Sequence, residues 1–325
     1  MEKFPTREEA VEKGSSSFEK KNRAWESAKK KLRILATVGM MSVPWAGWAG
    51  LETLKALDCM EPDEYIELVE KDRELNEEEE RDLAEKLNYL VDEYDTRVLK
   101  ILERSSEKAK ESKEGEAPEI EGFEIFGISN KDLGDLWNEE NYPKGTLKGN
   151  IEKIKFVVAS EKISSYGYYH GEAEAAGKAE SSTNELTLMG SSETLEESEK
   201  KIKGNLDWHF SHELGHLNDW DAAQNLSLEE RAEFLYEVTQ ALNKPDSFRD
   251  ALGYLDSFKG SGAGFKYKKT SEYWGILCEY YFTFPEILAE HAKEYTLVEK
   301  WIKRMDKDFD PVKARDRRKE TLKEL

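Results

Sequence analysis

His212-Glu213-Leu214-Gly215-His216 is the stretch of this chain that decides its fold. On a helix, side chains four residues apart lie on one face, so the imidazoles of His212 and His216 can bind one cation together. Catalytic zinc sites accept such nitrogen ligands and keep one of four positions for water. Glu213 can reach that water as a general base without binding the metal. We expect a zinc-binding helix here; the alternative is a surface helix that carries these residues by chance.

A third ligand is needed, because two histidines do not complete a zinc site. A metzincin would carry Gly at position 219 and His at position 222, but the chain has Asp219 and Ala222, which excludes that class. A carboxylate from a second helix is the remaining common option. The downstream segment 272–295 offers four glutamates, Glu272, Glu279, Glu286 and Glu290.

Glu286 and Glu290 are the favoured pair among these glutamates. Pro285 suits the first turn of a helix, which places Glu286 in that turn and Glu290 one turn later on the same face. One carboxylate can bind the metal while the other accepts the outer N–H of a ligand histidine. The competing interpretation is a capping box, since Thr283-Phe-Pro-Glu286 fits the pattern S/T-x-x-E. The spacing favours the ligand role.

The segments 212–219 and 285–290 together resemble the gluzincin pattern of peptidases of the anthrax lethal factor type. The resemblance spans roughly residues 150–300. It implies a zincin-like domain with Glu213 as the base and Glu290 as support for a ligand histidine. The zinc ligands that it implies are His212, His216 and Glu286.

The resemblance also implies a residue that donates a hydrogen bond to the oxyanion formed in the reaction. Family members carry a tyrosine seven residues before the third ligand, where this chain has Glu279 followed by Tyr280 and Tyr281. The resemblance therefore implies that one of these two tyrosines, or another residue, steadies the oxyanion. Asp219 is expected either to support a ligand histidine or to interact with the end of the helix. His209 shares the face of the pair, but we expect it to be packed or partly exposed rather than a ligand.

Short strands are expected before the motif helix. Residues 154–159 and 185–189 are rich in β-formers, and residues 166–170 are a third candidate, followed by a loop over 171–182. Strands that run into a metal-binding helix match the zincin layout, in which an edge strand holds an extended peptide. A peptide or protein is therefore the expected substrate.

The rest of the chain reads as mainly helical. Helices are expected over 16–35, 62–75 and 76–107, and Ser227-Leu-Glu-Glu230 fits a capping box that opens another. The expected fold class is α+β, with a helical N-terminal domain and, as the resemblance implies, a zincin-like domain with a small mixed sheet. The expected boundaries are a helical domain over 1–104, a linker over 105–122, a peptidase domain over 123–302 and a charged helix or tail over 303–325.

Composition limits the partners and the compartment. A formal net charge of -20 and a pI of about 4.9 argue against nucleic acid as a partner. Two cysteines and a charged N-terminus without a signal peptide favour the cytoplasm, with membrane association or export without a signal as alternatives. Residues 34–51 carry no charge. Their glycines and proline favour a buried hairpin or interfacial segment over a transmembrane helix.

The expected function is that of a zinc-dependent metalloendopeptidase, in which Glu213 activates a metal-bound water. The alternative is a catalytically inactive zincin-fold protein that serves binding or assembly through its helical N-terminal domain.

Overall fold

The computed structural model of the 325-residue chain describes most of the sequence after residue 59. The described residues are 60–109, 118–121, 129–144, 146–147, 151–159, 177–180, 185–191, 194–217, 226–245, 247–248, 255 and 262–324. The chain divides at Met60, and Glu61–Leu325 form one compact unit. The expected helix 16–35, the apolar segment 34–51 and the expected strand 166–170 lie outside the described residues. In the part of the chain that the structure describes, no helix has the length and apolar character needed to cross a bilayer.

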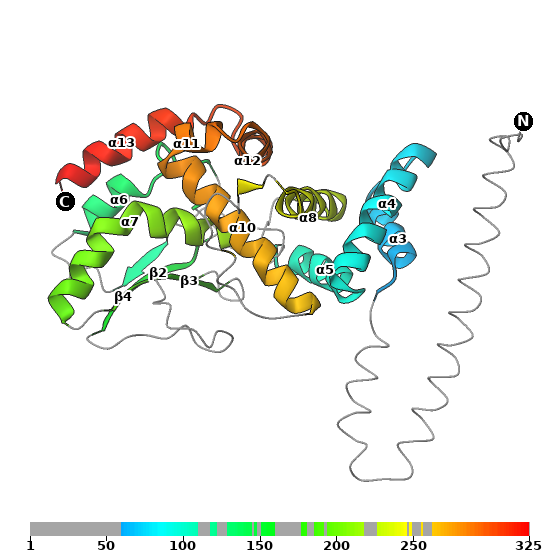
Figure 1. Ribbon diagram of the computed structural model, residues 1–325, viewed down its shortest axis with the longest axis horizontal. Coiled ribbons are helices and arrows are strands. Elements are labelled where there is room, and N and C mark those ends of the chain that lie inside the picture. Colours follow the sequence, from blue (N-terminus) through cyan, green and yellow to red (C-terminus); the bar gives the residue numbers. More distant parts are fainter. Residues whose placement is uncertain are drawn as a thin grey trace, which may run out of the picture. The chain divides into compact units, whose positions relative to one another are not determined.

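A four-stranded sheet in the order β1-β2-β4-β3 forms one layer of this unit (Figure 1). Strands β1 (Glu119–Glu121), β2 (Lys153–Ala159) and β4 (Glu185–Ser191) are parallel, and β3 (Gly177–Glu180) runs antiparallel to β4 at the edge. The two strands that the β-formers predicted, β2 and β4, are confirmed. Strand β3 falls in the expected loop 171–182 and is held by its pairing with β4. The expected α+β class with a small mixed sheet is confirmed at this level.

The motif lies on α7 (Leu195–Leu217), as its sequence predicts. The backbone leaves helical geometry at Asn205, with φ -122° and ψ 15°, so α7 consists of two helical pieces. Helix α7 packs on the sheet, and Phe210 and Leu214 of its second piece, which carries the motif, are buried. The ring of Trp137 stacks on that of Phe210 with centroids 4.3 Å apart. The motif is thus anchored to the core on the side away from its histidines.

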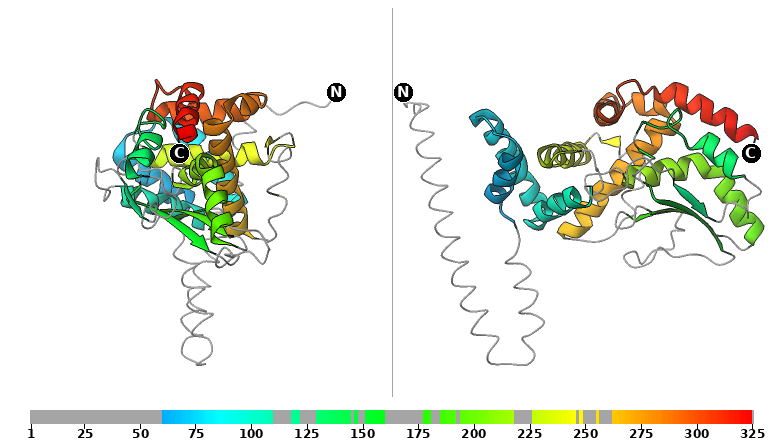
Figure 2. Two further views of the ribbon diagram at one scale, coloured as in Figure 1. Left: turned by 90° about the vertical axis from the view of Figure 1, so that its left-hand side faces the viewer. Right: turned by 180° about the vertical axis from the view of Figure 1, so that it is seen from behind.

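Helix α10 (Ala263–Thr283) lies against α7 on the face away from the sheet, as the views in Figures 1 and 2 agree. About half of its residues are buried, and Trp274, Leu277 and Phe282 on it belong to the core. The chain continues through three further helices, α11 (Pro285–Ala289), α12 (Ala292–Met305) and α13 (Pro311–Glu324). Helix α13 lies in the charged helix or tail expected over 303–325, yet Ala314 and Arg318 on it are fully buried.

The N-terminal helices of the described part belong to the same unit as the site. They are α3 (Pro62–Asp72), α4 (Glu77–Tyr94) and α5 (Arg97–Ala109), followed by α6 (Asn130–Leu136). The Tyr94 hydroxyl hydrogen-bonds Thr239 on α8 (Leu228–Leu242) at 2.8 Å and Thr270 on α10 at 2.5 Å. Buried hydrogen bonds therefore join α4 to two helices that follow the motif in the sequence.

Local sequence rules account for several helix ends. The capping box expected at Ser227 is present and opens α8. The single helix expected over 76–107 is instead two, because Asp95 adopts φ 74° and ends α4. Positive φ is uncommon for a residue other than glycine, and Asp tolerates it better than most. The Asp95 carboxylate then accepts the backbone N–H of Arg97 at 2.9 Å and starts α5.

Candidate metal centre

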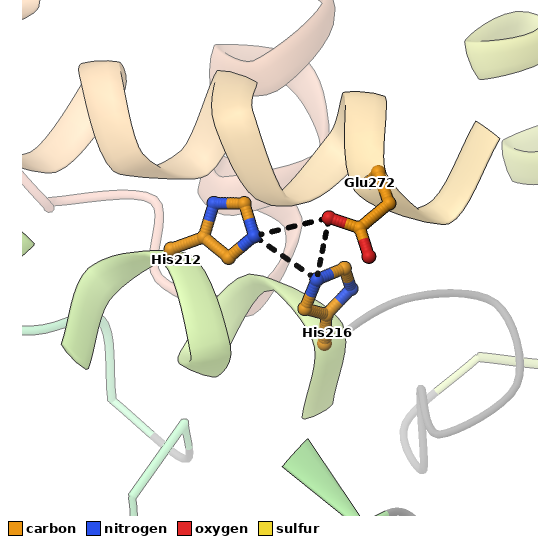
Figure 3. A group of neighbouring side chains, drawn as sticks. All are labelled: His212, His216 and Glu272. Atoms are coloured by element: carbon orange, nitrogen blue, oxygen red, sulfur yellow. Dashed lines mark hydrogen bonds and ion pairs between the residues drawn. The ribbon is translucent and has the colours of Figure 1, made fainter. Parts of the chain in front are cut away.

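Three side chains from α7 and α10 converge on one point (Figure 3). The Nε2 atoms of His212 and His216 are 3.1 Å apart. The Oε2 atom of Glu272 lies 3.5 Å from Nε2 of His212 and 3.7 Å from Nε2 of His216. Each of the three side chains is about 15% exposed, so the cluster is largely buried.

The triangle of donor atoms has the size of a zinc site. With zinc–ligand bonds of about 2.0–2.1 Å, two ligands of a tetrahedral ion are about 3.3 Å apart. The observed separations of 3.1, 3.5 and 3.7 Å bracket that value. Two imidazole nitrogens and one carboxylate oxygen are also a donor set of catalytic zinc sites, where water takes the fourth position. The residues present therefore fit a metal ion of this kind.

The outer nitrogen of each histidine is held by a further residue of α10. Nδ1 of His212 lies 3.0 Å from Oε2 of Glu279, and Nδ1 of His216 lies 3.0 Å from Oγ of Ser271. A histidine that donates its Nδ1–H to such an oxygen presents the lone pair of Nε2 on its other side. Both lone pairs then point at the position shared with Glu272.

Two glycines allow α7 and α10 to approach closely at this point. A Cβ atom on Gly215 would lie 2.9 Å from Cβ of Cys278 and 3.0 Å from Cα of Gly275. A Cβ atom on Gly275 would lie 3.1 Å from Nε2 of His212 and 3.1 Å from Cε1 of His216. Only glycine leaves room here, because any side chain would press on the partner helix or on the imidazoles.

The electrostatics of the cluster favour bound positive charge. Burial acts to lower the pKa of His212, but hydrogen bonds with Glu272 and Glu279 outweigh it and raise that pKa to about 10. Burial acts to raise the pKa of Glu272, and the hydrogen bonds with both histidines reverse this and hold it well below its usual range. Glu272 is thus kept as a carboxylate, which is the form that binds a metal ion.

Glu213 lies beside this centre in a different environment. The side chain is buried, and burial raises the pKa of its carboxyl above the ordinary value, while the two histidines oppose the change. The backbone N–H of Ala179 on β3 donates a hydrogen bond to the carboxylate. The pKa values of Glu213 and Glu272 are thus shifted in opposite directions, because only Glu272 hydrogen-bonds both histidines.

The expected third ligand, Glu286, is not brought to the histidines. Its side chain is 59% exposed and pairs with Arg315 on α13, and Glu290 is also exposed. The cause is the end of α10: Phe284 leaves helical geometry with φ -135° and ψ 54°, and α11 is only five residues long. Glu272 lies beside the two histidines, where Glu286 was expected. Glu279 lies beside Nδ1 of His212, where Glu290 was expected. The competing interpretation, a capping box opened by Thr283, does not hold either, because Phe284 is the N-cap of α11 and makes no side-chain cap hydrogen bond.

The two tyrosines expected near the oxyanion lie among other aromatic residues. Tyr281 is fully buried, with ring centroids 5.5 Å from Tyr295 and 5.7 Å from Phe282. Tyr280 packs edge-on against Phe248 at 4.9 Å. Neither tyrosine has a hydrogen bond to the two histidines or Glu272 among the described interactions.

Two further expectations concern the surroundings of the motif. His209 is half-buried, and burial with the nearby His212 lowers its pKa to about 4. It is not part of the cluster formed by the described residues. Asp219 lies outside the described residues.

The spacing of residues in the sequence gives one clue to the roles of Glu272 and Glu279. Glu272, Gly275 and Glu279 stand at positions i, i+3 and i+7, which share one face of a helix. The residues between them are mostly aromatic and aliphatic, so the segment is read as a core helix. Pro285 predicts the start of the next helix, which favoured Glu286 as the ligand instead.

Comparison of the chain with protein-family models, curated proteins and solved structures finds no match.

Proposed function

We propose that the chain is a zinc-dependent peptidase whose metal is held by His212, His216 and Glu272. The convergence of their three donor atoms, with separations suited to a tetrahedral ion, is the observation that carries this proposal. Bound zinc would polarise a water molecule and the carbonyl of the substrate.

Glu213 is the proposed general base. It follows His212 directly and lies buried within electrostatic reach of both histidines and Glu272. Its carboxylate takes a proton from the attacking water as the new C–O bond forms. It then delivers that proton to the amide nitrogen as the C–N bond breaks. Its raised pKa favours the second transfer, since a carboxyl closer to neutral pH both accepts and returns a proton readily.

A peptide is the proposed substrate because of the sheet edge beside Glu213. Among the described strands, β3 is the last of the sheet on the side of β4, and its Ala179 hydrogen-bonds the proposed base. An extended peptide can add to such an edge through main-chain hydrogen bonds. The motif helix packed on β3 and β4 is the arrangement that the proposed zincin-like domain requires.

The test is turnover by zinc-loaded full-length protein and its Glu213→Gln variant on a proteome-derived peptide mixture. The variant should keep one zinc ion and lose about 10²- to 10⁴-fold in cleavage rate, as for other general bases. Glu286→Gln is the matched control, since this glutamate is exposed, and it should cleave like the parent.

Two results would count against the proposal. If Glu213→Gln cleaved the peptides as fast as the parent, Glu213 would not be the general base. Zinc binding by the parent without any turnover would favour the alternative function, a zinc-stabilised binding or assembly protein.

A further inference from the structure

A buried arginine of the C-terminal helix touches both helices of the candidate metal centre. Arg318 on α13 is fully buried. Its Nε donates to Oδ1 of Asp207 on α7 at 2.7 Å, and its Nη2 donates to the carbonyl of Phe282 on α10. Its Nη1 donates to the carbonyl of Asn141 at 2.6 Å.

Asp207 is placed to control the direction of the motif. It lies two residues after the kink at Asn205, in the first turn of the helical piece that continues to His212 and His216. The Tyr142 hydroxyl also donates to Asp207 Oδ1, at 2.9 Å, so the carboxylate is held from two sides. A change at this carboxylate would therefore let the first turn of the motif piece move.

The Phe282 carbonyl lies at the C-terminal end of α10. It lies in the last turn of α10, where carbonyls have no partner within the helix. Glu279, which holds His212, is three residues earlier on the same helix. Arg318 thus joins the beginning of the motif piece of α7 to the end of α10.

A second close contact between these helices is the glycine approach. At Gly215 and Gly275 the helices are as close as their backbones permit. His212 lies between this contact and the Arg318 contact along α7. His216 and Glu272 lie just beyond the glycine contact, so the ligands are all close to one of these two contacts. Together the two contacts restrict both the separation and the relative rotation of the two helices.

We propose that Arg318 is a positioning residue that sets the spacing of α7 and α10 and thereby the geometry of the His212, His216 and Glu272 ligand set. The inference rests on the proposed metal site. Its guanidinium suits this role because three N–H groups in a rigid plane reach three acceptors at once. A lysine would keep the charge but cannot reproduce that fork.

The experiment compares full-length parent, Arg318→Lys and Arg231→Lys proteins. Arg231 is a matched control, because it is also a fully buried arginine and donates to the carbonyl of Leu226 at 3.0 Å, before α8. The readouts are the zinc dissociation constant by chelator competition, the visible spectrum of the cobalt-substituted protein, and the melting temperature. The cobalt spectrum reports ligand geometry, which a general loss of stability does not alter.

We expect Arg318→Lys to weaken zinc binding about 10- to 100-fold, as when other residues that orient metal ligands are lost. Its cobalt spectrum should change, while Arg231→Lys should melt at a lower temperature with the parent's affinity and spectrum. If Arg318→Lys does not fold, Asp207→Asn removes the charge of one acceptor with little change of shape and should show the same two changes.

The outcomes separate this inference from the proposed function. A parent that binds no zinc or cobalt overturns the proposed function and the inference together. A parent that binds zinc, with unchanged affinity and spectrum in Arg318→Lys and in Asp207→Asn, overturns the inference alone.

Discussion

At the scale of the residue, the candidate centre depends on which nitrogen of each histidine carries its proton. Glu279 and Ser271 each lie 3.0 Å from an Nδ1 atom. Both oxygens favour the tautomer that leaves Nε2 free for a metal ion. The two oxygens that accept these N–H groups are therefore as important for metal binding as the histidines themselves.

Replacement of Glu279 tests that dependence. Glu279→Ala should weaken zinc binding about 10- to 100-fold, because His212 would lose the acceptor for its Nδ1–H. Glu279→Gln retains an oxygen at the same place and should lie much closer to the parent. Chelator competition measures both affinities. Equal affinity in the parent and both variants would show that Glu279 does not orient His212.

At the scale of the element, the site is the contact between α7 and α10. The motif helix was predictable because its residues form a fixed short pattern, and β2 and β4 were predictable because Ile, Val, Phe and Leu favour strands. Strand β3 was not, since Gly177-Lys-Ala-Glu180 has no strong β-former and depends on its pairing with β4.

The third carboxylate could not be chosen from local sequence alone. Glu272 and Glu286 both lie in segments whose sequence predicts a helix. Which of the two reaches the histidines depends on where α10 ends and on how it crosses α7. Those are tertiary features, set by the glycine contact and by the break at Phe284. Arg318 was missed for a similar reason: a highly charged helix indicates an exposed one, and only the fold shows its partners.

Glycine substitution tests the helix contact. Gly275→Ala should weaken zinc binding and lower the melting temperature, because its methyl group would lie 3.1 Å from both imidazoles. Gly264→Ala is a control on the same helix, where a Cβ meets nothing within 4 Å. It should keep the parent's affinity and gain up to about 1 kcal/mol in helix stability. Full zinc affinity in Gly275→Ala would contradict the close contact.

At the scale of the whole molecule, Glu61–Leu325 behave as one unit in which early and late helices share a core. The hydrogen bonds from Tyr94 to Thr239 and Thr270 are buried and join α4 to α8 and α10. Because the site is built on α10, the stability of the N-terminal helices and that of the site should be coupled.

Tyr94→Phe tests this coupling. It removes one hydroxyl and leaves two buried threonine hydroxyls with one hydrogen bond fewer each, which should cost about 1–3 kcal/mol in the free energy of unfolding. Urea titration followed by circular dichroism and by tryptophan fluorescence should give one shared transition. Two separate transitions, with only the first shifted by the substitution, would mean that the early helices unfold independently. Tyr89→Phe, at a less buried hydrogen bond to Asn243, should have a smaller effect.

The central claim is that His212, His216 and Glu272 hold one metal ion, and zinc stoichiometry tests it most directly. Metal analysis of purified protein should find one zinc per chain in the parent. Glu272→Ala should lose it, while Glu286→Ala should keep it because that side chain pairs with Arg315 on the surface. One zinc per chain in Glu272→Ala, together with its loss in Glu286→Ala, would contradict the account.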